Sequence, residues 1–76
     1  MENVVRRTDP EVWIDLIFSA KAVADGGVIR RHRRWVDREV GRSRFVEEVR
    51  RRGFHLIETT DQLIVVCNRG PVRMHF

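Results

Sequence analysis

The sequence predicts an α+β fold in which N-terminal helices precede a small antiparallel sheet. Residues 9–52 place apolar side chains at helical spacing between helix-capping residues. Residues 54–76 instead alternate, or run apolar, in short stretches separated by turns. The chain has 76 residues, of which 42% are hydrophobic, so it is long enough for one small folded domain and too short for two. We therefore expect a single domain at residues 9–76 behind a flexible N-terminus at residues 1–8.

The first helix is expected at about residues 9–25. Thr8 or Asp9 can cap it, Pro10 suits its first turn, and the glycine pair at 26–27 ends it. Its apolar residues cover well over half of its circumference, which is wider than the stripe of a surface helix. Either this helix is central to the fold, or part of it meets a second subunit in a homodimer.

Two shorter helices are expected at about residues 33–40 and 43–52. Residues 28–34 are ambiguous, because Val28-Ile29 can begin either a short strand or an earlier helix, and we favour the short extended piece. Gly41 separates the two helices, Ser43 is the expected cap of the second, and Gly53 stands where a C-terminal cap belongs.

Three strands are expected at about residues 54–58, 63–68 and 72–76. The middle one is apolar throughout, and the outer two alternate apolar and polar residues. Turns at 59–62 and 68–71 separate them. Consecutive strands joined by short turns predict a three-stranded antiparallel meander.

This order of elements resembles a winged helix-turn-helix, with the helices at 33–40 and 43–52 as the helix pair and the turn at 59–62 as the wing tip. The resemblance implies a DNA-binding accessory or regulatory protein. Residues 43–76 also resemble the α-β-β-β unit of small RNA-binding folds. Neither resemblance fixes a function, because one fold serves many activities.

A local resemblance covers residues 48–58, 65–68 and 72–74. These stretches are similar to a group of short bacterial proteins, some of which carry the name phosphoribosylanthranilate isomerase. The enzyme of that name is a (β/α)₈ barrel, which needs about 200 residues or more. We therefore do not expect that activity here.

Arginine dominates the charge of the chain. The net charge is +4, and 14 of the 15 basic residues are arginine, with Lys21 the exception. A planar guanidinium suits phosphate, carboxylate and aromatic faces. The same bias also follows from a GC-rich coding genome, without any functional cause.

The densest group of arginines is the candidate nucleic-acid site. Several guanidinium groups that converge on phosphates release counterions and so add affinity for DNA or RNA. Trp35 either stacks on a base or packs in the core, and the competing interpretation of the arginines is a solvated face. The seven candidate residues are Arg30, Arg31, Arg33, Arg34, Arg38, Arg42 and Arg44.

Catalytic and metal-binding signatures do not emerge from the sequence. His32, His55 and His75 match no zinc-ligand spacing with Cys67, so we expect no metal and no cofactor, and an enzyme is the less favoured class. Cys67 lies in an apolar run and is expected to be a small buried hydrophobe. The longest apolar run has five residues and the N-terminus lacks a signal-peptide pattern, so we expect a cytoplasmic protein without membrane contact.

Overall fold

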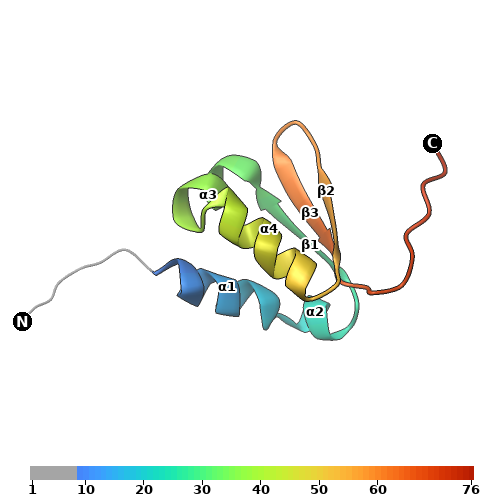
Figure 1. The fold of residues 1–76 in the computed structure, drawn as a ribbon, viewed down its shortest axis with the longest axis horizontal. Coiled ribbons are helices and arrows are strands. Elements are labelled where there is room, and N and C mark those ends of the chain that lie inside the picture. Colours follow the sequence, from blue (N-terminus) through green and yellow to red (C-terminus); the bar gives the residue numbers. More distant parts are fainter. Residues whose placement is uncertain (1–8) are drawn as a thin grey trace, which may run out of the picture.

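The computed structural model describes residues 9–76, which form four helices packed on one three-stranded antiparallel sheet of order β1-β3-β2 (Figure 1). This arrangement confirms the α+β class. The predicted flexibility of residues 1–8 lies outside the described residues. The elements in chain order are α1 (Pro10–Phe18), α2 (Lys21–Ala24), β1 (Val28–His32), α3 (Arg33–Glu39), α4 (Arg42–Arg51), β2 (His55–Glu58) and β3 (Gln62–Val66).

The first predicted helix is two helices. Asp9 caps α1 by accepting a hydrogen bond from the backbone N–H of Glu11 at 2.8 Å, and Pro10 is the first helical residue. The helix ends after Phe18 because Ala20 is extended, with ψ 154°. The prediction of a single helix over 9–25 is therefore wrong, although its C-terminal end is predicted correctly, since Gly26 has φ +74° just after α2. The amides of Gly26 and Gly27 both bond back to carbonyls of α2.

The third strand of the sheet is β1, and the predicted strand at 72–76 is wrong. β3 is the central strand and has β1 on one side and β2 on the other, so residues 72–76 have no free edge of β3 to join. Val28 pairs with Val66, and His32 pairs with Gln62. The favoured short extended piece at residues 28–29 is confirmed and continues through two arginines. Residues 67–76 carry no helix or strand, and Figure 1 shows the last of them leaving the body of the domain.

Helices α3 and α4 lie within about one residue of their predicted bounds. Gly41 joins them with φ +94° and ψ 129°, a conformation that essentially only glycine adopts. Gly41 is also the N-cap of α4, so the predicted cap at Ser43 is wrong. Gly53, at φ +76°, ends α4: its amide bonds to the Arg50 carbonyl and that of Phe54 to the Val49 carbonyl. These two bonds are those of a Schellman cap.

The core lies between the helices and one face of the sheet. Phe45 of α4 and Val65 of β3 are fully buried near its centre. Cys67 is buried there as a free thiol, as expected, and burial raises the pKa of this thiol. The full set of buried apolar residues is Ile14, Ile17, Phe18, Ile29, Val36, Val40, Phe45, Val49, Leu63, Val65 and Cys67.

The arrangement is loosely winged-helix-like. α3 and α4 form a helix pair joined by the two residues Val40 and Gly41, and the turn between β2 and β3 occupies the place of the wing. Trp35 of α3 is half-buried and meets Trp13 of α1 edge to face, with ring centroids 5.0 Å apart. The core-packing interpretation of Trp35 is the one that this geometry supports.

Candidate nucleic-acid interface

The seven candidate arginines lie on three consecutive elements. Arg30 and Arg31 belong to β1 and, as neighbours in a strand, point to opposite faces of the sheet. Three more lie on α3, and two lie in the first turn of α4. These seven guanidinium groups differ in whether they have a carboxylate partner within the domain.

Four of the seven candidates are engaged in ion pairs. Arg42 holds Asp37 through two nitrogens, at 2.8 and 3.2 Å, and this bidentate contact raises the pKa of the arginine. Arg42 also approaches Glu58 of β2 at 3.4 Å, where Arg33 binds the other carboxylate oxygen at 3.1 Å. These contacts join α3 and α4 to the end of β2. Arg38 pairs with Glu39 at 2.7 Å, and the shortest ion pair of Arg44 is with Glu11, also at 2.7 Å.

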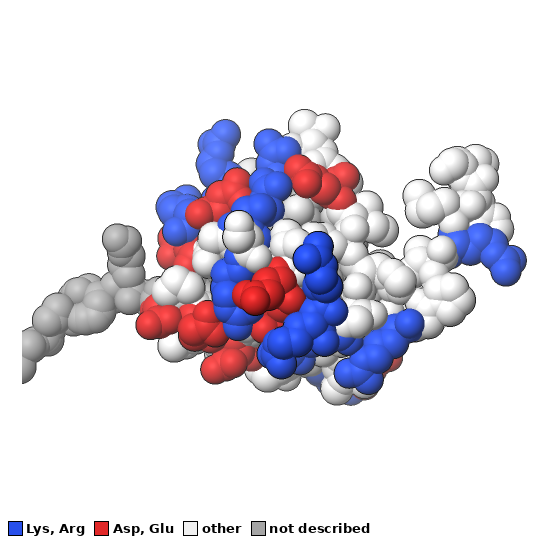
Figure 2. All heavy atoms as spheres, viewed as in Figure 1, with Lys and Arg blue, Asp and Glu red and all other residues white. Residues whose placement is uncertain are grey.

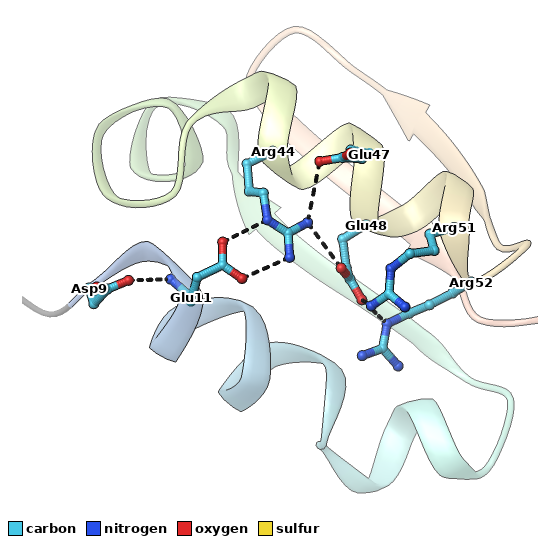
Figure 3. Close-up of polar contacts among 7 residues, drawn as sticks. All are labelled: Asp9, Glu11, Arg44, Glu47, Glu48, Arg51 and Arg52. Carbon is cyan, nitrogen blue, oxygen red and sulfur yellow. Dashed lines mark hydrogen bonds and ion pairs between the residues drawn. The ribbon is translucent and has the colours of Figure 1, made fainter.

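Arg44 connects α4 to α1. Figure 3 shows its guanidinium between the two helices, where it binds Glu11 through two nitrogens at 2.7 and 2.8 Å. The hydrogen bond from Arg44 lowers the pKa of Glu11, and the same contacts raise the pKa of Arg44. Glu11, in the first turn of α1, therefore binds a residue 33 positions away. Arg44 has a structural partner and is a poor candidate for contact with a ligand.

Glu48 is the centre of a cluster that the sequence did not reveal. Its side chain is fully buried, and Arg44 and Arg51 of α4 and Arg52, the C-cap of the helix, surround its carboxylate (Figure 3). Arg51 Nη2 and Arg52 Nε each donate to Oε2 at 2.6 Å. Arg44 Nη1 lies 3.0 Å from Oε1, in the geometry of an ion pair rather than of a hydrogen bond.

The electrostatics of Glu48 follow from this cluster. Burial alone raises the pKa of its carboxyl and is the largest single influence. The hydrogen bonds from Arg52 and Arg51 and the ion pair with Arg44 together outweigh it, so the pKa lies below the usual 4.5. Glu48 is therefore a buried anion, and Arg51 and Arg52 at the end of α4 serve the fold.

Helical spacing accounts for part of this cluster. Glu48 and Arg52 are an i,i+4 pair. Arg51 also binds Glu48, at i,i+3. The burial of Glu48 is indicated by its position three residues after Phe45 and next to Val49, on the buried side of the helix.

Three candidates have no carboxylate partner within residues 9–76: Arg30, Arg31 and Arg34, which we call the junction arginines. Arg31 donates to the carbonyl of Arg30 at 2.8 Å, and Arg30 and Arg34 are exposed. His32 lies between them and accepts a hydrogen bond from the Arg34 backbone N–H at 3.1 Å, which caps α3. The junction of β1 and α3 therefore carries three cations that the ion pairs described above leave uncompensated, with Arg30 and Arg31 on opposite faces of the sheet.

The rest of the surface mixes charges. Figure 2 shows Lys and Arg in separate groups, with Asp and Glu between them on the face in view. The turn at the wing position has the residues Thr59, Thr60 and Asp61, none of them basic. Outside the seven candidates, Arg50, Arg69 and Arg73 also lack a carboxylate partner among the described residues, and they lie apart on α4 and on the C-terminal segment.

Other kinds of site have little support in the part of the chain that the structure describes. Groups of three or more residues able to hold a metal ion do not occur in residues 9–76, and no helix there is long and apolar enough to cross a membrane. His55 bonds to the carbonyl of Gly70 at 2.6 Å, and His75 lies on the C-terminal segment. The comparisons with known proteins add no constraint: no family model, no curated protein and no solved structure matches this chain.

Proposed function

We propose that this protein is a small nucleic-acid-binding domain, of the winged-helix-like accessory or regulatory kind, that contacts phosphates through the junction arginines. The observation that carries the proposal is the division of the arginine group. Four of the seven candidates have carboxylate partners, whereas Arg30, Arg31 and Arg34 have none within residues 9–76. A guanidinium already bound to a carboxylate must break that contact before it meets a phosphate.

The core also holds the junction in place. β1 is an edge strand and α3 begins directly after it, so Arg30 and Arg31 project to the two faces of an exposed edge, with Arg34 on the adjoining helix. Phosphate contacts of this kind fix position and carry no base sequence. We therefore expect binding that depends strongly on salt and weakly on sequence, to a duplex of DNA or of RNA.

The test is fluorescence anisotropy with labelled DNA and RNA duplexes over a series of salt concentrations. Replacing Arg30, Arg31 and Arg34 together by glutamine is expected to flatten the slope of log K against log [salt] by about 2 to 3, since each lost phosphate contact changes it by about 0.9. The matched control replaces Arg50 and Arg73, two arginines outside the junction. The proposal is wrong if the unmodified protein does not bind at low salt, or if the control loses as much affinity as the junction variant.

A second candidate function is a homodimeric protein-interaction module that does not bind nucleic acid. It is favoured by an apolar patch on α1, where Val12 and Leu16 are 46% and 56% exposed and lie one helical turn apart. Leu16→Glu is the suitable test, because Leu16 does not belong to the buried core. We expect it to convert such a dimer into a folded monomer; a monomeric unmodified protein would remove this candidate.

A further inference from the structure

The edge of the sheet at β2 has an apolar hollow beside it. The hollow has a volume of about 250 Å³ and is lined by Val46, Val49, Arg50, Gly53, Phe54 and Leu56. Leu56 pairs with Val65, which is fully buried, so the side chains of Phe54 and Leu56 face the helices. The hollow therefore lies between α4 and the free edge of β2.

This edge is the less protected of the two. An edge strand offers unpaired backbone N–H and C=O groups to any extended chain, and charged side chains discourage such pairing. The other edge strand, β1, carries Arg30 and Arg31, whereas β2 carries only Glu58 as a charged group, at its end. A strand added beside β2 would place every second side chain in the hollow.

The chain itself contains a segment of matching pattern. Val72, Met74 and Phe76 alternate with Arg73 and His75, and all five are exposed; the exposed fraction of Met74 is 72%. Figure 1 shows this segment extending away from the domain. Three apolar side chains on one side of an extended chain are what an edge with a flanking apolar groove binds.

The geometry favours pairing of β2 with the C-terminal segment of another copy over pairing with the segment of its own copy. The bond from His55 to the Gly70 carbonyl fixes the base of the segment at the beginning of β2. From there the segment can return along its own β2 only in parallel, the slightly less stable pairing. The segment of a second copy can run antiparallel, and a twofold axis allows both copies to make the same contact.

We propose that the protein forms a homodimer in which residues 71–76 of each copy add as an antiparallel strand to β2 of the other. Val72, Met74 and Phe76 then occupy the hollow beneath α4. The junction arginines lie on β1 and α3 and take no part in this contact, so this proposal stands or falls independently of nucleic-acid binding.

The first test is sedimentation equilibrium of the full chain and of the variant Met74→Glu. We expect a dimer that this change weakens about a hundredfold or more, because each of the two contacts loses a buried methionine side chain. The matched control is Arg73→Gln, on the other side of the same segment, and it should leave the dimer intact. A monomer at all concentrations, or a dimer that survives Met74→Glu, overturns the proposal.

The second test is complementation. Val46→Glu blocks the hollow, and Met74→Glu blocks the segment, so each variant alone should be monomeric. An equimolar mixture can form one of the two contacts and should therefore associate more strongly than either variant alone. If Val46→Glu does not fold, the Met74→Glu result decides by itself. If Leu16→Glu dissociates the dimer while Met74→Glu does not, the interface is α1 and the proposal is wrong.

Discussion

Replacing the buried carboxylate at the centre of the arginine cluster should strongly destabilise the fold. Glu48→Gln keeps the size of the side chain, removes its charge and turns an amide donor toward guanidinium groups that are donors themselves. A hydrogen bond to a charged group contributes about 1.5–3 kcal/mol. The three arginine side chains are 29%, 67% and 31% exposed and regain water when their partner is neutral. We therefore expect a loss of about 2–4 kcal/mol, below the sum of the two hydrogen bonds and the ion pair with Arg44.

That loss is large for a domain of this size. At about 0.05–0.15 kcal/mol per residue, a chain of 76 residues has a free energy of unfolding of about 4–11 kcal/mol. Urea denaturation followed by circular dichroism at neutral pH measures the difference. The matched control is Glu47→Gln, because Glu47 is next in sequence and 72% exposed, with its nearest guanidinium nitrogen 3.8 Å away. An exposed pair of this kind contributes about 0–1 kcal/mol.

The stabilisation by Glu48 should depend on pH. The pKa of Glu48 in the folded protein lies below 4.5, so its contribution to stability is present above pH 4.5 and is lost as the pH falls through the folded pKa. The difference in free energy of unfolding between the unmodified protein and Glu48→Gln should therefore become smaller below pH 4.5. The reasoning is refuted if Glu48→Gln costs no more than Glu47→Gln, or if this difference is unchanged in acid.

Three further changes test the core, the turn and the buried thiol. Phe45→Ala removes a fully buried ring and should cost about 3–5 kcal/mol in thermal or urea unfolding, whereas a loss below 1 kcal/mol would contradict the described core. Gly41→Ala should cost about 1–3 kcal/mol from backbone strain alone, since an added Cβ meets no atom within 4 Å; an unchanged midpoint would mean that the turn differs. Cys67 should react with a thiol reagent slowly in buffer and rapidly in urea, because the thiol is buried and its pKa is raised; equal rates would place it at the surface.

Local signals predicted much of the fold. Asp9, Gly41 and Gly53 mark helix boundaries by their own chemistry, and the apolar run after Gln62 identified the central strand. The extent of β1 was not predictable in this way, because Arg30 and Arg31 do not alternate with apolar residues. The strand expected at 72–76 failed for a different reason: its alternation is that of a strand, and only the order of the sheet excludes it from β3.

The candidate site was predictable as a region and not in detail. Arginine density located the region, but its division into paired and unpaired residues depends on contacts across the chain. Arg33 and Glu58 are 25 residues apart, and Arg44 and Glu11 are 33 apart. No local pattern relates such pairs. The burial of Glu48 likewise depends on where α1 packs, which its own helix does not determine.

The most direct test of the proposed function is a titration of the protein with a nucleic-acid duplex, followed through the Nε–H signals of its arginine side chains by NMR. We expect the signals of Arg30, Arg31 and Arg34 to shift together and to return as salt is added. The signals of Arg44 and Arg52, which Glu11 and Glu48 hold, should stay in place. Shifts confined to Arg50 and the C-terminal segment, or no shift at low salt, would contradict the assignment of the junction arginines as the binding site.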